Sequence, residues 1–386
     1  MELLLFFTAV VGHATLVVFS HNWWYGQALP RKLTDVIQLL HGLLVLAGPI
    51  GFWLAAGLDL LSLFPPGTAY LWHSLAAGYV ALCWLTGVVL LPAVTLARWR
   101  HRPSALVKET SEVVDVAQEL GHRPIGEGKH RWLAYLPGNE IFTVDFTRKT
   151  LVLPRLPAEW EGLTILHLGD LHFCGTPALA WYEWVAERCA ALEPDILAIT
   201  GDFVDGRDRH AWLAPVLRRL RCREMSLAIL GNHDKWYGAS EVRARLADLG
   251  FVVLGNSWQE RTLRGRTLIV VGNETPWMRP GPDLSELPEG FRLCLSHTPD
   301  NVAWGRRHGL DLMLCGHVHG GQIRLPVLGS IVVPSRCGRR YDCGVFDEPP
   351  TVMHVTRGLA GKHPVRYGCR PEVALLTLCR TGESVG

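Results

Sequence analysis

The chain has 386 residues, of which 48% are hydrophobic and 19% are charged. Wholly soluble chains usually carry about 25% charged residues, so this composition excludes a disordered or fibrous protein and indicates a soluble domain attached to membrane segments. The 38 basic and 36 acidic residues give a formal net charge of +2, and this balance gives no support for a nucleic-acid partner. The 10 cysteines form no CxxC pair, which favours reduced, buried thiols in a reducing compartment.

The N-terminal quarter predicts a transmembrane region of about three helices. Residues 3–30 contain no Asp, Glu, Lys or Arg, and residues 36–97 contain one, Asp59. A membrane span needs about 20 apolar residues. A signal peptide begins with basic residues, whereas Glu2 stands at this position, so we expect the first helix to be retained. The expected helices lie at 3–21, 36–58 and 69–96, with a Phe-Pro-Pro-Gly turn at 64–67.

Basic residues near the ends of these helices predict the orientation. Arg31 and Lys32 lie in the first loop, and Arg98 and Arg100 follow the third helix. Three spans place these two segments on the same side of the membrane, and basic loops face the cytoplasm. We therefore expect residues 97–386 to be cytoplasmic. A few polar residues lie within or near the spans, and we expect hydrogen bonds inside the bundle for them rather than a functional role: His13, His41, Asp59 and His73.

The remainder predicts a layered α/β domain. Residues 98–155 form a linker with lead-in strands, in which the charged residues 108–120 favour a short helix and residues 141–153 alternate like two strands. Apolar runs of strand length then recur through residues 156–386, and the first three are separated by amphipathic stretches of helical length. The later runs are closer together, which favours a mixed sheet or a two-sheet sandwich. The runs are 163–168, 195–200, 226–230, 267–272, 292–297 and 311–316.

Residues of metal-ligand type follow five of these apolar runs. They are Asp170 and His172, then Asp202 and Asp205, then Asn232 and His233, then His297, and finally His317 and His319. The carboxyl ends of strands are where α/β domains place their sites. Carboxylates and imidazoles without a thiolate favour Mn, Fe or Zn, and their number predicts paired cations, which suit phosphoryl transfer. Because residues i and i+2 point the same way in an extended chain, we expect each D-x-H or H-x-H pair to share one direction.

In this order, the five clusters resemble the calcineurin-like metallophosphoesterase superfamily, and in particular its small bacterial membrane-associated branch. The resemblance runs from about residue 156 to residue 378 and includes LPAEWEGLTILHLGDLH, GHVHGGQIRLP and VTRGLAGKHPVRYGCRPEVALLTL. It implies an αββα two-sheet metallophosphoesterase sandwich over residues 156–386, preceded by the transmembrane region 1–97 and the linker 98–155. Gly169 and Val318 depart from the residues usual in the family, and neither change affects a ligand position.

The resemblance also implies a role for each matched residue. Asp170, His172 and His319 would bind one metal ion, Asn232, His297 and His317 would bind the other, and Asp202 would bridge the two. His233 would act on the leaving group as the general acid, and Asp205 would orient it. The cofactors would be two divalent transition-metal ions, with Mn favoured over Fe or Zn, and they would activate a hydroxide for attack on phosphorus.

The implied function is hydrolysis of phosphoester or pyrophosphate bonds at the surface of the bacterial inner membrane, by a catalytic domain in the cytoplasm. The partners would be the lipid bilayer and a phosphorylated substrate, which the membrane helices favour as lipid-linked. Two alternatives are a specific UDP-2,3-diacylglucosamine-type lipid pyrophosphatase and a non-catalytic, metal-bound membrane sensor or adaptor. Arg207, Arg209 and Arg366 are further candidates for contact with a phosphate, and Trp236 for stacking on a substrate.

Overall fold

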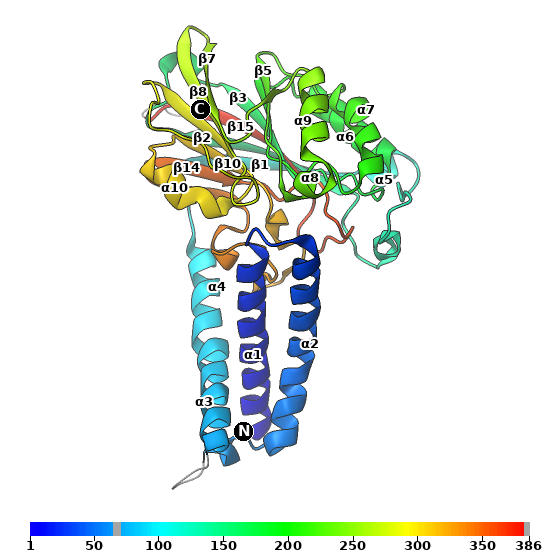
Figure 1. The fold of residues 1–386 in the computed structure, drawn as a ribbon, viewed down its shortest axis with the longest axis vertical. Helices are drawn as coiled ribbons and strands as arrows, with labels where there is room; N and C mark the ends of the chain where they lie inside the picture. Colours follow the sequence, from blue (N-terminus) through cyan, green and yellow to red (C-terminus); the bar gives the residue numbers. More distant parts are fainter. Residues whose placement is uncertain (65–70, 382–386) are drawn as a thin grey trace. The chain divides into compact units, whose positions relative to one another are not determined.

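The computed structural model describes residues 1–64 and 71–381 of the chain (Figure 1). Two compact units are present. The membrane unit comprises Met1–Arg102 and Val327–Arg340, and the sheet unit comprises Pro103–Pro326 and Tyr341–Gly386. The predicted turn at 64–67 lies outside the described residues except for Phe64. The predicted division of the chain at 97/98 and 155/156 stays a prediction.

The membrane unit is built from long apolar helices that lie side by side (Figure 1). They are α1 (Glu2–Tyr25), α2 (Arg31–Ala56), and α3 (Leu71–Leu85), which continues through a π-helical turn (Thr86–Leu90) into α4 (Leu91–Arg100). Three segments are long and apolar enough to cross a membrane, Glu2–Tyr25, Arg31–Ala56 and Ser74–Arg100. The three predicted spans are therefore confirmed as helices, and the protein is membrane-associated through them.

Two of the polar residues in the spans have hydrogen-bond partners within the bundle. Nδ1 of His13 lies 2.6 Å from the Tyr79 hydroxyl, and its Nε2 lies 2.8 Å from the Leu44 carbonyl. Nε2 of His41 lies 3.0 Å from the Ser20 hydroxyl. These contacts support the structural interpretation of both histidines. The side chain of His73 lies outside the described residues.

Helix α1 also binds a segment from the C-terminal half of the chain. The segment Val327–Arg340 belongs to the membrane unit and contains the short strand β12 (Gly329–Ser330). The Asn22 side chain donates to the Ile331 carbonyl at 3.2 Å and accepts from the Val333 backbone amide at 2.9 Å. Asn22 and Val333 are both buried. No local sequence pattern predicts this association, because the two partners are more than 300 residues apart in the chain.

The sheet unit contains two mixed sheets, which confirms the predicted α/β two-sheet fold. The order of the first is β1 (Leu106–Asp115), β2 (Thr143–Val152), β15 (Glu372–Cys379), β3 (Thr164–Leu168), β4 (Ile196–Ile199), β5 (Met225–Ala228) and β6 (Val252–Val253). The order of the second is β13 (Gly344–Glu348), β14 (Thr351–Val355), β10 (Leu312–Cys315), β9 (Phe291–Ser296), β8 (Arg266–Asn273) and β7 (Trp258–Leu263). A further short strand is β11 (Arg324–Leu325). Strands β3, β4 and β5 run parallel, as do β8, β9 and β10.

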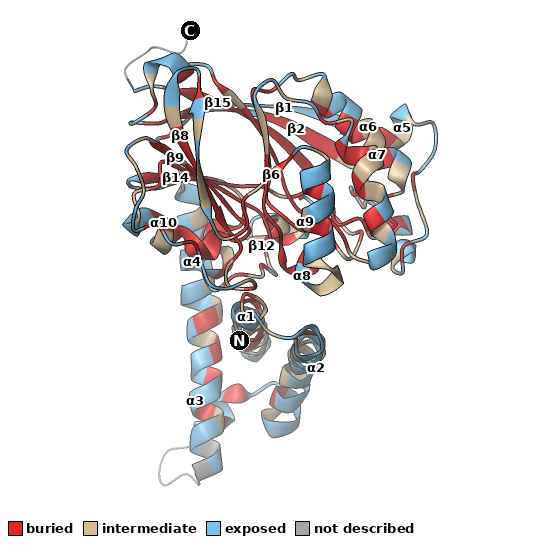
Figure 2. Ribbon diagram, turned by 45° about the horizontal axis from the view of Figure 1, so that its top comes forward, coloured by how far each residue is buried: buried red, intermediate tan, exposed pale blue. Residues whose placement is uncertain are grey.

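Apolar side chains on both faces of the first sheet explain the layering. In β4, Ile196 and Ala198 pack into the core that includes the second sheet, whereas Leu197 and Ile199 pack into the core that includes helix α6. Alternate residues of a strand point to opposite faces, so the uniformly apolar runs are typical of strands covered on both sides. Figure 2 shows the strands β8, β9 and β14 as buried and the outer face of helix α9 as exposed.

The α-helices of the sheet unit are α5 (Val116–Glu119), α6 (Leu179–Ala190), α7 (Leu213–Leu217), α8 (Asn232–Tyr237), α9 (Ala239–Asp248) and α10 (Val302–Arg307).

Two expectations for the lead-in segment are wrong. Residues 106–115 form strand β1 and not a helix, because they pair antiparallel with β2 along the edge of the first sheet. The side chains of Lys108, Glu109 and Glu112 are exposed, and charged side chains are how natural edge strands avoid pairing with other chains. Only α5 is helical here, and the Asp115 side chain caps it by accepting from the Ala117 amide. Residues 143–152 form one strand and not two.

Candidate metal centre

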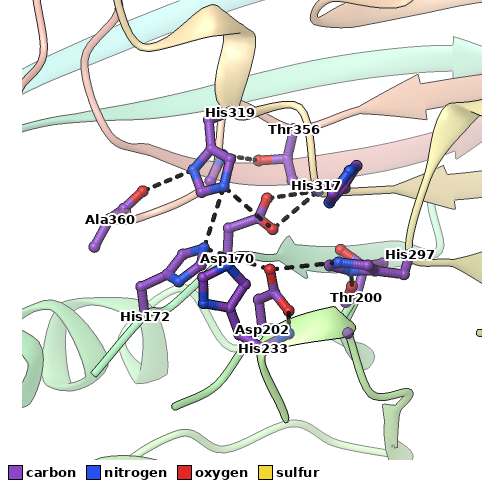
Figure 3. A network of polar contacts seen from close by, with 12 residues as sticks. Asp170, His172, Thr200, Asp202, His233, His297, His317, His319, Thr356 and Ala360 are labelled. Carbon is purple, nitrogen blue, oxygen red and sulfur yellow. Dashed lines mark hydrogen bonds and ion pairs between the residues drawn. The ribbon is translucent and has the colours of Figure 1, made fainter. Parts of the chain in front are cut away.

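The candidate ligands converge at the carboxyl ends of the parallel strands. They lie in the loops after β3, β4, β5, β9 and β10, where the sequence placed them. Figure 3 shows the labelled candidates with their side chains pointing toward one another, namely Asp170, His172, Asp202, His297, His317 and His319. Three groups have ligand atoms within 4.8 Å of one another: Asp170, His172, Asp202 and His319; Asp202, His297 and His317; and His172, Asp205 and His233. All the carboxylates and imidazoles that follow the five apolar runs are therefore brought together, and Asn232 adds its amide oxygen 3.0 Å from Nε2 of His297.

The backbone at the site is strained, which differs from the expected extended chain. Five residues of the site have a positive φ, namely Asp170, His172, Asp202, His317 and His319. A non-glycine residue in this region costs about 1–3 kcal/mol. Each D-x-H or H-x-H pair thus turns tightly toward the centre, and alternation along a strand is not what aligns it. The surrounding hydrogen bonds hold this conformation: the Asp170 amide, for example, donates to the Gly201 carbonyl at 3.0 Å.

Hydrogen bonds fix which nitrogen of each histidine faces the centre. Nδ1 of His319 lies 2.9 Å from the Ala360 carbonyl, and Nδ1 of His297 lies 2.7 Å from the Thr200 carbonyl. A carbonyl oxygen only accepts, so both Nδ1 atoms carry the proton. Nε2 of each ring is then the nitrogen that is directed into the site and that would bind a cation. Metal-binding histidines are commonly held in this way by an outer acceptor.

Asp202 lies between the two groups of ligands (Figure 3). Its Oδ2 is 3.5 Å from Nε2 of His172 and 3.4 Å from Nε2 of His297. Its Oδ1 accepts from the backbone amide of His233 at 2.8 Å, which fixes the carboxylate plane. One carboxylate oxygen therefore faces candidate ligands of both groups, which is the position that a bridging role would require.

The arrangement fits divalent cations. Nε2 of His172 and Nε2 of His319 are 3.1 Å apart, and Nδ1 of each ring faces an outer acceptor. Because the pKa of His172 is raised to about 9, its Nε2 carries a proton and donates it to Nε2 of His319. A cation would take the place of this proton between the two nitrogens. Nε2 of His317 is buried and has no hydrogen-bond partner among the described residues. Carboxylate, imidazole and amide donors without a thiolate suit Mn, Fe or Zn.

The protonation states show how strongly these groups interact. Burial raises the pKa of the Asp170 carboxyl to about 6. Burial also opposes ionisation of Asp202, but His297, His233 and His172 outweigh it and hold the pKa of Asp202 well below its usual value. Burial would lower the pKa of His172, yet the carboxylate of Asp205 raises it to about 9. Asp202 likewise raises the pKa of His297 to about 9 against the effect of burial.

Asp205 contacts two histidines and not one. Its Oδ1 forms a short contact with Nδ1 of His233, the pairing that the sequence predicted. Its Oδ2 lies 3.0 Å from Nδ1 of His172. Both imidazoles keep the Asp205 carboxylate ionised, since their charges outweigh the effect of burial and place its pKa far below the usual value.

The sequence interpretation missed Asp234, which joins two of the loops. Its Oδ2 accepts from the Gly231 amide at 2.9 Å, and its Oδ1 accepts from the Phe203 amide at 2.9 Å. Asp234 is fully buried and therefore positions the loops that carry Asp202 and His233. The signal in the sequence was its position at the end of the run Gly-Asn-His-Asp, residues 231–234, directly after two candidate site residues. Gly231 is required beside it, because a Cβ there would lie 2.1 Å from Oδ1 of Asp202.

The other candidates have different surroundings. Arg366 is fully buried and donates to the carbonyls of Arg357 at 2.8 Å, His319 at 3.1 Å and Ala360, so it holds the loops and does not face a phosphate. Arg207 is exposed, and the Arg209 guanidinium packs over the Trp212 ring at 5.0 Å. The rings of Trp236 and His233 are 4.7 Å apart, which accounts for Trp236 by packing.

Comparisons with known proteins agree with this geometry. A family model described as calcineurin-like phosphoesterase matches residues 163–321. An uncharacterized metallophosphoesterase of Bacillus subtilis, YkuE, is 31% identical over 66% of this chain and 91% of its own length. Phosphodiesterase YaeI of Escherichia coli is 32% identical over 55% of this chain and 81% of its own. The UDP-2,3-diacylglucosamine pyrophosphatase LpxG of Chlamydia trachomatis is 24% identical over 60% of this chain and 88% of its own.

The residues that the family model matches, 163–321, include every candidate ligand and the His233–Asp205 pair. The two-sheet fold, the site at the strand ends and the sequence similarity point to the same conclusion. The chain belongs to the calcineurin-like metallophosphoesterase family and is a phosphoester hydrolase.

Proposed function

We propose that the protein hydrolyses phosphodiester or diphosphate bonds of a lipid-linked substrate at the membrane surface, with two divalent cations held by the site. Asp170, His172 and His319 would hold one cation, Asn232, His297 and His317 would hold the other, and Asp202 would be shared. The observation that carries the proposal is the position of Asp202, whose Oδ2 lies 3.5 Å and 3.4 Å from histidines of the two groups.

The chain's own residues supply the rest of the chemistry. When bound, the cations would polarise the phosphoryl group and lower the pKa of a water molecule. His233 is mostly buried at the start of α8, beside the ligands but outside the proposed sets. The Asp205 carboxylate contacts its Nδ1, so a proton on Nε2 can be donated to the leaving oxygen. An intact His233–Asp205 pair favours catalysis over a sensor or adaptor role.

Three features support a lipid-linked substrate and a cytoplasmic domain. The apolar spans keep the sheet unit close to a bilayer. The relative LpxG is named for activity on a diacylated nucleotide sugar, and YaeI for phosphodiester cleavage. Arg31 and Lys32 in the first loop and the basic residues after the last span agree with a cytoplasmic orientation in the bacterial inner membrane. Mn²⁺ is the cation we propose, with Fe and Zn as alternatives.

The test is a substrate panel on the purified full-length protein in detergent. The panel contains p-nitrophenyl phosphate, bis(p-nitrophenyl) phosphate and UDP-2,3-diacylglucosamine, each with Mn²⁺ and with EDTA. We expect Mn²⁺-dependent hydrolysis of the diester and of the diphosphate, and much slower hydrolysis of the monoester. Hydrolysis of the monoester alone would contradict the proposed substrate class, and activity that survives EDTA would contradict the metal requirement.

A further inference from the structure

The segment between α5 and β2 lies against the rim of the metal centre. This rim segment, residues 121–142, appears in Figure 1 as the loop that follows α5. The Ala178 amide donates to the Pro124 carbonyl at 2.8 Å, and the Glu140 amide donates to the Arg366 carbonyl at 2.8 Å. Residues 174–178 follow the ligand His172 closely in the chain, so the rim segment is attached to the loop that positions this ligand.

Two glycines make this contact close. A Cβ on Gly126 would lie 2.1 Å from the Gly175 carbonyl oxygen, and a Cβ on Gly128 would lie 3.0 Å from the Cys174 carbonyl oxygen. The Gly128 amide donates to the Thr176 hydroxyl at 3.3 Å. The backbone of residues 126–128 thus packs directly against the backbone of residues 174–176. This contact fixes the position of the residues that follow Gly128.

The first side chains after this contact meet a second loop of the rim. The rings of His130 and His363 are 4.5 Å apart. The His363 carbonyl accepts from the Gln322 side chain at 3.1 Å, and Gln322 follows the ligand His319 by three residues. His363 is therefore tied to the loop of a candidate metal ligand, and His130 is tied to His363.

These two histidines and their lysine neighbours form a basic cluster, which comprises Lys129, His130, Lys362 and His363. Lys129 is exposed and the other three are half-buried. Burial, and then the charges of Lys129 and Lys362, lower the pKa of His130. Burial, His130 and Lys362 lower the pKa of His363 to about 4, and the smaller effects of Asp205 and His233 also reach it. Both imidazoles are therefore neutral near pH 7 and can donate a hydrogen bond, and the positive charges nearest to them are those of Lys129 and Lys362.

We infer that the basic cluster binds the second phosphoryl group of a diphosphate substrate, the one carried by the leaving group. The inference rests on the proposed function, because His233 marks the side on which the leaving group departs. A leaving group that is itself a phosphate monoester places two to three oxygens beyond the bridging oxygen. His363 is three residues after Ala360, whose carbonyl contacts Nδ1 of His319, and the charges of Asp205 and His233 act on the His363 imidazole. The His130 ring lies 4.5 Å from the His363 ring. A simple phosphodiester has no group to fill this place.

The reaction balances with these groups. An oxygen of water forms a bond to the phosphorus at the metal centre, and that water loses one proton to solvent. The bond from this phosphorus to the bridging oxygen breaks, and its electron pair stays on the bridging oxygen. This oxygen takes a proton from His233 and remains part of the second phosphoryl group. The basic cluster would stabilise the negative charge of this departing monoester.

The experiment measures competition by a diphosphate against a reporter with one phosphorus atom. The reporter is bis(p-nitrophenyl) phosphate with Mn²⁺, and the competitor is UDP-glucose. The variants are His130→Asn and His363→Asn in the full-length protein, and the matched control is His122→Asn, an exposed histidine of the same rim segment. A hydrogen bond to a charged group contributes about 1.5–3 kcal/mol, and about 1.4 kcal/mol corresponds to tenfold in binding.

We expect the inhibition constant of UDP-glucose to rise at least about tenfold in His130→Asn and in His363→Asn. The KM of the reporter should change far less, the His122→Asn control should match the wild type, and all proteins should hold the same amount of metal. An unchanged inhibition constant, an equal rise in the reporter KM, or a wild type that UDP-glucose does not inhibit would each overturn the inference while leaving hydrolysis itself intact. If the wild type does not hydrolyse the reporter or any substrate of the panel, the proposed function fails first and the inference fails with it.

Discussion

Nδ1 of His172 lies 3.0 Å from Oδ2 of Asp205. The sequence resemblance implies only that Asp205 orients His233. On that basis, replacing Asp205 should lower kcat and leave the metal content unchanged. The structure gives this carboxylate a second partner, and that partner is a candidate metal ligand. An outer acceptor of this kind orients the imidazole and raises its basicity as a ligand.

Replacing Asp205 with Asn should therefore weaken metal binding as well as slow the reaction. Loss of an outer partner of a metal-binding histidine typically costs about 10–100-fold in metal affinity. We expect a loss of this size for the cation held by His172, measured by titration with Mn²⁺ at equilibrium, together with a lower kcat at saturating metal. Unchanged affinity in this variant would show that Asp205 serves His233 only.

Replacing His233 with Asn should slow catalysis and leave the metal content unchanged. His233 contacts Asp205 but belongs to neither proposed ligand set. Positioned acid catalysis contributes about 10²–10⁴-fold, so kcat on a substrate with a poor leaving group should fall by that factor. A nitrophenyl ester needs less protonation of its leaving oxygen and should show a smaller loss.

Metal analysis by mass spectrometry provides the control for this variant. Both cations should remain bound in His233→Asn. If one cation is lost, His233 is itself a ligand and the acid role is wrong. If kcat is the same as in the wild type on every substrate, the hydrolysis proceeds without this proton donor.

Replacing Asp202 with Ala should disrupt both cation sites at once. Its Oδ2 faces Nε2 of both His172 and His297, and its Oδ1 holds the His233 amide. We expect fewer than two cations per chain and no detectable hydrolysis. Gln259→Ala on strand β7 provides a control, since this residue lies in the second sheet away from the site. An Asp202→Ala protein with two cations and full activity would refute the bridging assignment.

Metal binding should depend on pH through His172 and His297. Without metal, the pKa of each is raised to about 9, so both carry an extra proton at pH 7. A metal ligand must be a neutral imidazole, so binding must release these protons. We expect about one proton released per cation and about a tenfold gain in apparent affinity per pH unit between pH 7 and 8. Calorimetry in buffers of different ionisation enthalpy measures the release, and a value near zero would contradict these protonation states.

The orientation of the spans is also testable. If residues 97–386 face the cytoplasm, a phosphatase reporter that is active only after export should be inactive when fused to the C-terminus. The same reporter inserted in the 65–70 connection should be active. Strong activity of the C-terminal fusion would reverse the orientation and place the catalytic domain outside the cytoplasm.

The sequence predicted the strands and the gathering of the site because both depend on local pattern. Each of the six apolar runs became a strand, and each ligand-type cluster after them entered the site. Parallel strands end at the same edge of a sheet, so residues that follow them meet there whatever the intervening chain does. The all-apolar pattern of β4, with Ile196 and Leu197 in different cores, also follows from burial on both faces.

Features that depend on distant contacts could not be predicted in this way. The left-handed conformations of Asp170 and His172 are imposed by bonds to other loops, such as the one from the Asp170 amide to Gly201. The charged residues of β1 have weak strand propensity, and pairing with β2 decides their conformation. The second partner of Asp205 became visible only when the loops after β3 and β4 were placed together.

The bonds between Asn22 and the segment Val327–Arg340 change what cleavage of the chain would do. The backbone passes between the two units at three places: after Arg102, after Pro326 and after Arg340. A protease that cuts only at the first of these places would not release the sheet unit from the bilayer, because Val327–Arg340 would still be bound to α1. A shortened chain that begins at Pro103 would carry the same segment without Asn22, and would expose Val333 to solvent. The attachment is therefore made by the N-terminal helices and by an internal segment of the C-terminal half, and we expect that cutting the chain after Arg102 alone does not detach the enzyme.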